Sequence, residues 1–265
     1  MTNWNQAVCQ INGISIHYTR SGGDKPIVVL LHGLTANGAC WTGLARVLEK
    51  EYDIIMPDAR GHGESGVPDV GYRYEDYATD VIGLINLLGL PPVILLGHSM
   101  GGLTAAVVTC KCPELIRGLI LADPTFLSPK VQREVCDSDV VDQHRQMLGK
   151  SLENLEAELQ IRHPNRSLET IELIARARLQ TSITAFDVLT PPNPDYEGLI
   201  RTIHVPGLLV YGDKGVVSSD VAEELQILNP HLQVKLIPEA GHGLQYDQPE
   251  RFAAIVGSFM RSISH

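Results

Sequence analysis

The sequence holds one serine whose surroundings suit nucleophilic chemistry. Ser99 lies in GHSMG (97–101), after the apolar run Val93–Leu96 and before a segment rich in small residues. A strand, a tight turn and a helix in this order lift a serine hydroxyl above a sheet, and the turn is too tight for side chains at the two glycine positions. The N-terminus of the following helix also favours negative charge near that hydroxyl. We therefore expect Ser99 to be a nucleophile.

A serine hydroxyl at neutral pH needs a base, and histidine has a pKa suited to that task. His242 lies in EAGHG (239–243), directly after the apolar run Val234–Ile237. The glycines beside it allow the loop to carry the imidazole over the end of that strand. We expect His242 to be the general base. For His98, beside the nucleophile, two roles stay open, which are shaping the substrate pocket and packing beneath the turn.

The elements that must position these residues follow from the hydrophobic pattern. Short, continuous apolar runs suit strands that are buried on both faces, and they occur at 27–31, 54–56, 93–96, 119–122, 208–211 and 234–237. Segments with helical periodicity lie between most of them, at 38–50, 74–88, 101–110, 219–228 and 249–262. This alternation predicts an α/β fold with a mostly parallel sheet and helices on both faces.

Two further segments depart from this alternation. The turn pair Asn12-Gly13 separates two short strand-like runs and predicts an N-terminal hairpin. The range 124–201 has no strand signal, is helical in pattern and is divided by prolines. An ordinary crossover usually needs only one helix. We therefore expect a core domain from 1–123 and 202–265, with 124–201 inserted as a helical cap.

Composition restricts the partners. The 265-residue chain has a formal net charge of −10 and no run of Lys or Arg, which argues against binding to nucleic acid or to an anionic membrane. It has no apolar stretch of about 18 residues and no signal-peptide core near its start. Its five scattered cysteines do not suggest a disulfide framework. We expect a cytoplasmic protein without a metal site or a cofactor.

Four motifs together resemble the α/β-hydrolase family, in its branch of small single-domain serine esterases and lactonases. They are HG at 32–33, DARGHGES at 58–65, GHSMG at 97–101 and GHG at 241–243. They occur in the order and at the spacing of that family, over residues 8–263, and the likeness is weakest in the cap. The resemblance implies an α/β-hydrolase fold with a helical cap. It also implies an oxyanion hole formed by the backbone N–H groups of Leu34 and Met100, with His32 bracing the loop.

The acid of the triad is where the sequence departs from the family pattern. Most members place this aspartate after the strand that follows the cap, in a G-x-x-D pattern, but the corresponding stretch GDKG (212–215) ends in Gly215. A second known location is the end of the strand before the cap, which here is Asp123. We predict Asp123 as the acid and keep Asp213, which needs a different loop path, as the alternative. Capping of the first cap helix remains another role for Asp123.

The predicted reaction is acyl transfer. A serine nucleophile, in place of an aspartate, argues against dehalogenase or epoxide hydrolase chemistry and favours a small to medium ester or lactone that reacts through an acyl-enzyme. Hydrolysis of amides, thioesters or activated C–C bonds uses the same residues, and a slow-turnover small-molecule receptor retains them. The candidate substrate contacts are His98, Phe126, Met147 and Phe186, and for the last three core packing is the alternative.

Overall fold

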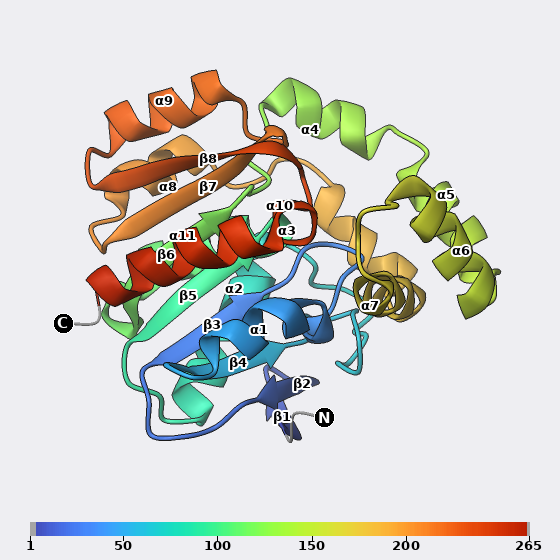
Figure 1. The fold of residues 1–265 in the computed structure, drawn as a ribbon, viewed down its shortest axis with the longest axis horizontal. Coiled ribbons are helices and arrows are strands. Elements are labelled where there is room, and N and C mark those ends of the chain that lie inside the picture. The colour runs from blue at the N-terminus through green and yellow to red at the C-terminus, as the bar shows by residue number, and fades with distance from the viewer. Residues whose placement is uncertain (1–3, 264–265) are drawn as a thin grey trace.

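The computed structural model describes residues 4–263, and a central sheet of eight strands organises them. The strands are β1 (Asn5–Ile11), β2 (Ile14–Arg20), β3 (Ile27–Leu31), β4 (Asp53–Pro57), β5 (Val93–His98), β6 (Ile116–Ala122), β7 (Gly207–Lys214) and β8 (Leu232–Gly241). Their order is β1-β2-β4-β3-β5-β6-β7-β8 (Figure 1). The hairpin β1-β2 and the pair β2-β4 are antiparallel, and every other pair is parallel.

Each apolar run in the sequence lies within one of these strands, and these runs are covered on both faces except in edge strand β8, where Lys235 and Leu236 are exposed. In β3, Val28 and Leu30 belong to one hydrophobic cluster, while Val29 and Leu31 belong to the cluster on the opposite face. Alternate residues of a strand point to opposite faces, so a strand covered on both sides needs apolar residues at every position.

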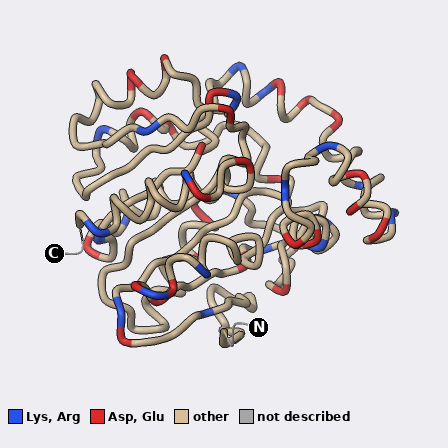
Figure 2. The backbone as a smooth tube through the Cα atoms, viewed as in Figure 1, with Lys and Arg blue, Asp and Glu red and all other residues tan. Residues whose placement is uncertain are grey.

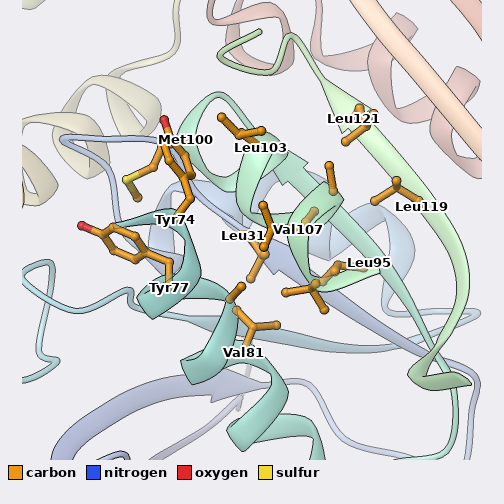
Figure 3. Packing of buried hydrophobic residues seen from close by; sticks show 14 of the residues in the cluster. Leu31, Tyr74, Tyr77, Val81, Leu95, Met100, Leu103, Val107, Leu119 and Leu121 are labelled. Carbon is orange, nitrogen blue, oxygen red and sulfur yellow. The ribbon is translucent and has the colours of Figure 1, made fainter. Parts of the chain in front are cut away.

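Helices cover the two faces of the sheet. The helices are α1 (Thr42–Leu48), α2 (Tyr74–Leu87), α3 (Met100–Lys111), α4 (Pro129–Cys136), α5 (Val140–Leu148), α6 (Leu152–Arg162), α7 (Leu168–Leu179), α8 (Tyr196–Thr202), α9 (Ser219–Leu228), α10 (Leu244–Asp247) and α11 (Pro249–Ser262). The 3₁₀ helices are η1 (Gly38–Trp41), η2 (Pro113–Leu115) and η3 (Ile183–Leu189). Residues of α2, α3, α8 and α9 pack on one face of the sheet, as Figure 3 shows for α2 and α3, and residues of α1 and α11 pack on the other.

The segment between β6 and β7 contains only helices and forms most of the projecting part of the molecule at the right of Figure 1. Helices α6 and α7 have a hydrophobic cluster of their own, which includes Leu155, Ile174 and, from η1, Cys40. All of helix α8 except Thr202 lies within the range 124–201 that the sequence suggested as a cap, yet the helix packs against α3 and α9 beside the sheet. The cap boundaries stay a prediction, and α8 belongs by its contacts to the layer that covers the sheet.

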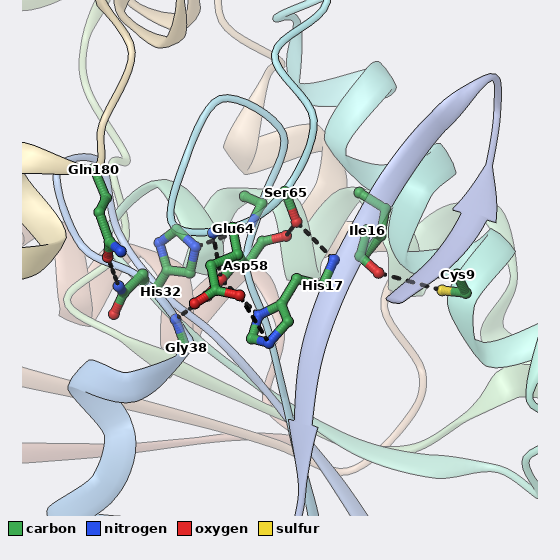
Figure 4. A network of polar contacts seen from close by, with 11 residues as sticks. Cys9, Ile16, His17, His32, Gly38, Asp58, Glu64, Ser65 and Gln180 are labelled. Atoms are coloured by element: carbon green, nitrogen blue, oxygen red, sulfur yellow. Dashed lines mark hydrogen bonds and ion pairs between the residues drawn. The ribbon is translucent and has the colours of Figure 1, made fainter. Parts of the chain in front are cut away.

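A buried carboxylate joins the loops at the carboxyl edge of the sheet. Asp58 accepts hydrogen bonds from the backbone N–H groups of Gly38 (2.7 Å) and Glu64 (2.9 Å), and its Oδ2 lies 2.8 Å from Nδ1 of His17 (Figure 4). Burial alone raises the pKa of Asp58, but the hydrogen bonds from His17 and Glu64 outweigh it and hold the pKa below its usual value. The ionised carboxylate thus ties β2 to the loops that follow β3 and β4.

None of the helices within residues 4–263 combines the length and the apolar character that crossing a bilayer requires.

Arg60 is a buried arginine whose guanidinium is paired with a carboxylate. Its Nε and Nη2 atoms each lie 2.7 Å from a different oxygen of Asp80, and both side chains are less than 10% exposed. A bidentate pair of the same type, Arg46 with Glu169, lies at the surface. The two pairs therefore differ mainly in burial.

We predict that Arg60→Leu lowers the free energy of unfolding by about 3–5 kcal/mol, because it leaves the buried Asp80 without its partner. Arg46→Leu, the control, changes it by no more than about 1 kcal/mol, because water screens the exposed pair. Urea unfolding measures both values. Equal losses in the two variants would contradict the importance assigned to burial.

Candidate active site

Ser99 sits on a strained turn between β5 and α3. Its backbone dihedrals are φ 56° and ψ −120°, a conformation that costs a non-glycine residue on the order of 1–3 kcal/mol. A Cβ at Gly97 would lie 2.0 Å from the carbonyl oxygen of Gly101, and a Cβ at Gly101 would lie 2.5 Å from that of Leu31. Both glycines are therefore required by close backbone approach, as the motif predicts.

The side chains of Ser99, His242 and Asp123 form a continuous hydrogen-bonded chain. Ser99 Oγ lies 2.8 Å from Nε2 of His242, and Nδ1 of His242 lies 2.6 Å from Oδ2 of Asp123. The Asp123 side chain is fully buried, whereas that of His242 is 40% exposed. The three residues come from the ends of β5, β8 and β6.

Asp123 is held in place by backbone donors. The N–H groups of Val216 and Val217 donate to its carboxylate at 2.8 and 2.9 Å. A Cβ at Gly215 would lie only 2.7 Å from each of its oxygens, so the carboxylate occupies the space that a side chain at 215 would need. Asp123 does not cap a helix, because Ser128 is the N-cap of α4.

Asp213 lies elsewhere. Its carboxylate is exposed and accepts a hydrogen bond from the backbone N–H of Ala240 at 3.1 Å. It therefore ties the end of β7 to the end of β8. The structure brings Asp123, and not Asp213, against the imidazole of His242.

The two backbone N–H groups expected to form an oxyanion hole belong to residues beside Ser99. Met100 is the first residue of α3, where helical N–H groups have no partner within the helix. Leu34 lines the same cavity as Ser99 and His242. In the part of the chain that the structure describes, neither N–H donates a hydrogen bond. Both donors are therefore free to bind an oxyanion.

His32 orders the loop that carries Leu34. Its Nε2 accepts the backbone N–H of Ala59 at 2.9 Å, and its Nδ1 therefore donates to the carbonyl of Gly33 at 2.8 Å. Burial lowers the pKa of His32, so the ring is neutral. Further along the loop, Asn37 donates to the side chain of Gln180 at the end of α7 (Figure 4).

His98 supports the loop of His242. Its Nε2–H donates to the carbonyl oxygen of His242 at 2.7 Å, and the two rings lie 4.7 Å apart. Burial, reinforced by His242, lowers the pKa of His98 to about 3. His98 therefore acts as a neutral donor behind the imidazole, although one edge lines a small cavity of about 310 Å³ that also contains Ser99.

The main cavity over Ser99 measures about 490 Å³. Met147 and Phe186, both expected to contact substrate, line it together with Ser99 and His242. Phe126 does not line it, because its ring stacks on Tyr196 at 4.9 Å and packs into the core of the sheet. Within residues 4–263, no group of three or more His, Cys, Asp or Glu side chains is arranged to hold a metal ion.

Several polar residues around the two cavities were not anticipated from the sequence. They are Thr35, His144, Arg162, Arg166 and Arg178. For Arg178 a signal exists, because Ile171, Ile174, Ala175 and Arg178 follow the i, i+3, i+4, i+7 spacing of the buried stripe of α7. A cation at the last position of an apolar stripe indicates that this end of the helix faces a polar space.

Comparison with known sequences identifies the class of protein. Residues 28–255 match the Alpha/beta hydrolase family, and the chain belongs to that family. The eight-stranded, mostly parallel sheet with flanking helices is the fold of its solved relatives.

Particular relatives cover nearly the whole chain. A 2-(acetamidomethylene)succinate hydrolase of Mesorhizobium japonicum is 28% identical, over 91% of this chain and 90% of its own. An N-formylmaleamate deformylase of Pseudomonas putida is 29% identical, over 94% of both chains. A crystal structure of E-2-(acetamidomethylene)succinate hydrolase superposes with a TM-score of 0.85 at 26% identity, over 98% of this chain and all of the other. A malate-bound thermophilic esterase from Thermogutta terrifontis gives a TM-score of 0.80 at 27% identity, over 98% and 100%.

The neutral state of His98 predicts a pH dependence of stability. The pKa of a histidine is about 6.5 in the unfolded chain, while burial lowers that of folded His98 to about 3. The unfolded state therefore takes up the proton first as the pH falls. This contribution to stability is complete above pH 6.5 and is lost between about pH 6.5 and 3, at up to about 1.4 kcal/mol per pH unit.

We expect His98→Gln, which keeps a side-chain N–H donor, to lose stability less steeply than the wild type between pH 6.5 and 5. The difference in slope should be about 1 kcal/mol per pH unit. Urea unfolding at pH 7, 6 and 5 gives both slopes. Parallel slopes for the two proteins would show that His98 does not carry this pH dependence.

Proposed function

We propose that the protein is a serine hydrolase that cleaves a carboxylic ester or lactone of a small to medium molecule. Ser99 is the nucleophile, His242 the general base and Asp123 the acid of the triad. The observation that carries the proposal is the unbroken chain from Ser99 Oγ through His242 to Asp123, at 2.8 and 2.6 Å, beneath a cavity of about 490 Å³.

In the first half of the reaction, Ser99 Oγ attacks the substrate carbonyl carbon while Nε2 of His242 accepts the hydroxyl proton. The carbonyl oxygen becomes an oxyanion that the N–H groups of Leu34 and Met100 stabilise. Asp123 holds the imidazole in the correct tautomer and stabilises its charged form. His242 then returns the proton to the leaving alcohol oxygen, and the acyl-enzyme remains.

In the second half, water replaces the alcohol. His242 accepts a proton from the water as its oxygen attacks the acyl carbonyl, and the second oxyanion forms in the same place. Collapse breaks the bond to Ser99 Oγ, which regains its proton from His242. A lactone follows the same steps but releases a single hydroxy acid, because its alcohol and acyl parts are joined.

Amide hydrolysis is the second candidate, and the names of the relatives favour it. A deformylase acting on N-formylmaleamate and a hydrolase acting on an acetamido compound both act on small acids that bear an acylated nitrogen. The same triad serves this reaction, with His242 protonating a leaving nitrogen. An amine leaves less readily than an alcohol. Parallel assays of matched esters and N-acyl compounds decide between the two substrate classes.

The first test concerns the nucleophile. We expect a fluorophosphonate probe to modify Ser99, and Ser99→Ala to abolish labelling and lower the hydrolysis of 4-nitrophenyl acetate by at least about 1,000-fold, because the covalent route is lost. Mass spectrometry of the digested adduct identifies the modified residue. An adduct on a different serine, or full activity in Ser99→Ala, would contradict the assignment.

The second test concerns the acid. Asp123→Asn should lower kcat by roughly 100- to 10,000-fold, because the amide no longer stabilises the imidazolium or fixes its tautomer. Asp213→Asn, the control with the same chemical change, should stay within about threefold of the wild type, because its carboxylate contacts only the β7–β8 connection. Similar losses in the two variants would remove Asp123 from the triad.

A further inference from the structure

Four cationic side chains surround the two cavities that open onto Ser99. They are Lys150, Arg162, Arg166 and Arg178, while Glu158 and Asp247 are the only acidic side chains among the described residues that line these cavities. The lining therefore carries an excess of two positive charges in a chain whose formal net charge is −10. Figure 2 shows acidic and basic positions spread over the molecule, with no large basic region. The local excess is a property of the site.

Two of the four cations are already neutralised. Lys150 Nζ lies 2.7 and 2.6 Å from the two carboxylate oxygens of Glu158. Arg166 Nη2 lies 2.7 Å from Oδ1 of Asp247. These two pairs account for both acidic groups of the lining, so none remains for the other two arginines.

Arg178 and Arg162 have no such partner. Within residues 4–263 neither guanidinium makes a hydrogen bond or an ion pair. Arg162 is exposed at the end of α6, but Arg178 is partly buried and lines both cavities together with Ser99 and His242. Burial, together with Arg162 and Arg166, lowers the pKa of Arg178, which shows that its charge is poorly compensated.

The neighbouring Arg176 provides the contrast on the same helix. It points to solvent and pairs with Glu172 one turn earlier, which is the usual arrangement of a surface arginine. An arginine that is partly desolvated and has no counter-ion gives up hydration without compensation. Such an arrangement is stabilised when an anionic ligand supplies the missing charge and acceptors.

We propose that Arg178, assisted by Arg162, binds a carboxylate group of the substrate. The inference rests on the proposed function, because it names the substrate class of the same site. A guanidinium presents paired N–H donors that match the two oxygens of a carboxylate. Because Arg178 lines the cavities with the nucleophile, the charged group is held at a fixed side of the scissile carbonyl and orients it toward Ser99.

Binding of succinate, measured by isothermal titration calorimetry, tests the subsite without any hydrolysis. We expect the wild type to bind succinate and not the neutral succinamide, and Arg178→Gln to weaken succinate binding by at least about 30-fold. Arg176→Gln, the matched control on α7, should bind within about twofold of the wild type. Equal binding by wild type and Arg178→Gln overturns the proposal, as does binding of inorganic phosphate without succinate.

Hydrolysis then tests whether the subsite serves the reaction. The two substrates are 4-nitrophenyl hydrogen succinate and its neutral methyl ester, and the measured quantity is the ratio of their kcat/KM values. We expect this ratio to fall by at least about 30-fold in Arg178→Gln, to recover partly in Arg178→Lys and to remain within threefold in Arg176→Gln. An unchanged ratio in Arg178→Gln overturns the assignment.

The two proposals fail in different ways. A wild type that hydrolyses neither ester nor a matched N-acyl substrate removes the proposed reaction, while Arg178-dependent succinate binding still supports the anion subsite. Rapid hydrolysis without succinate binding or any preference for the anionic ester removes the subsite and leaves the serine hydrolase intact.

Discussion

The structure depends on the placement of one imidazole between a hydroxyl and a carboxylate that come from different strands. Parallel strands end at the same edge of a sheet, so the loops after β5, β6 and β8 meet there without long connections. The imidazole of His242 contacts both Ser99 and Asp123. The backbone N–H groups of Val216 and Val217 hold the carboxylate of Asp123 in position. The sheet and its flanking helices hold these three loop ends in place.

The carboxylate reaches this point from β6, although its usual source in the family is the strand next to it. β6 and β7 are adjacent, and Ala122 pairs with Val210, so either strand end can deliver a carboxylate to the same place. A side chain at Gly215 would overlap the carboxylate of Asp123. Gly215, at the usual acid position, therefore leaves the space that the carboxylate of Asp123 occupies. The sequence indicated Asp123 because it has this glycine together with an aspartate at the end of β6.

Features set by local backbone geometry were predictable from the sequence, and features set by packing between distant segments were not. The strands follow from apolar runs with both faces covered, and the turn at Ser99 follows from two glycines without room for side chains. Phe126 shows the limit, because only the position of α8 decides that its ring stacks on Tyr196 instead of facing the cavity. For Arg178 the sequence did contain a signal, because this residue continues the apolar stripe of α7. Its lack of a partner could not be predicted, because it depends on the pairing of Glu158 and Asp247 with other cations.

Asp247 connects the segment between α6 and α7 to the loop that carries His242. One carboxylate oxygen binds Arg166, in the connection between α6 and α7, and the other accepts the N–H of Gly241, the residue before His242. A displacement of the segment that contains Arg166 would therefore act through Asp247 on the loop that carries His242. The position of the segment between α6 and α7 and the position of the His242 imidazole are thus coupled through one side chain.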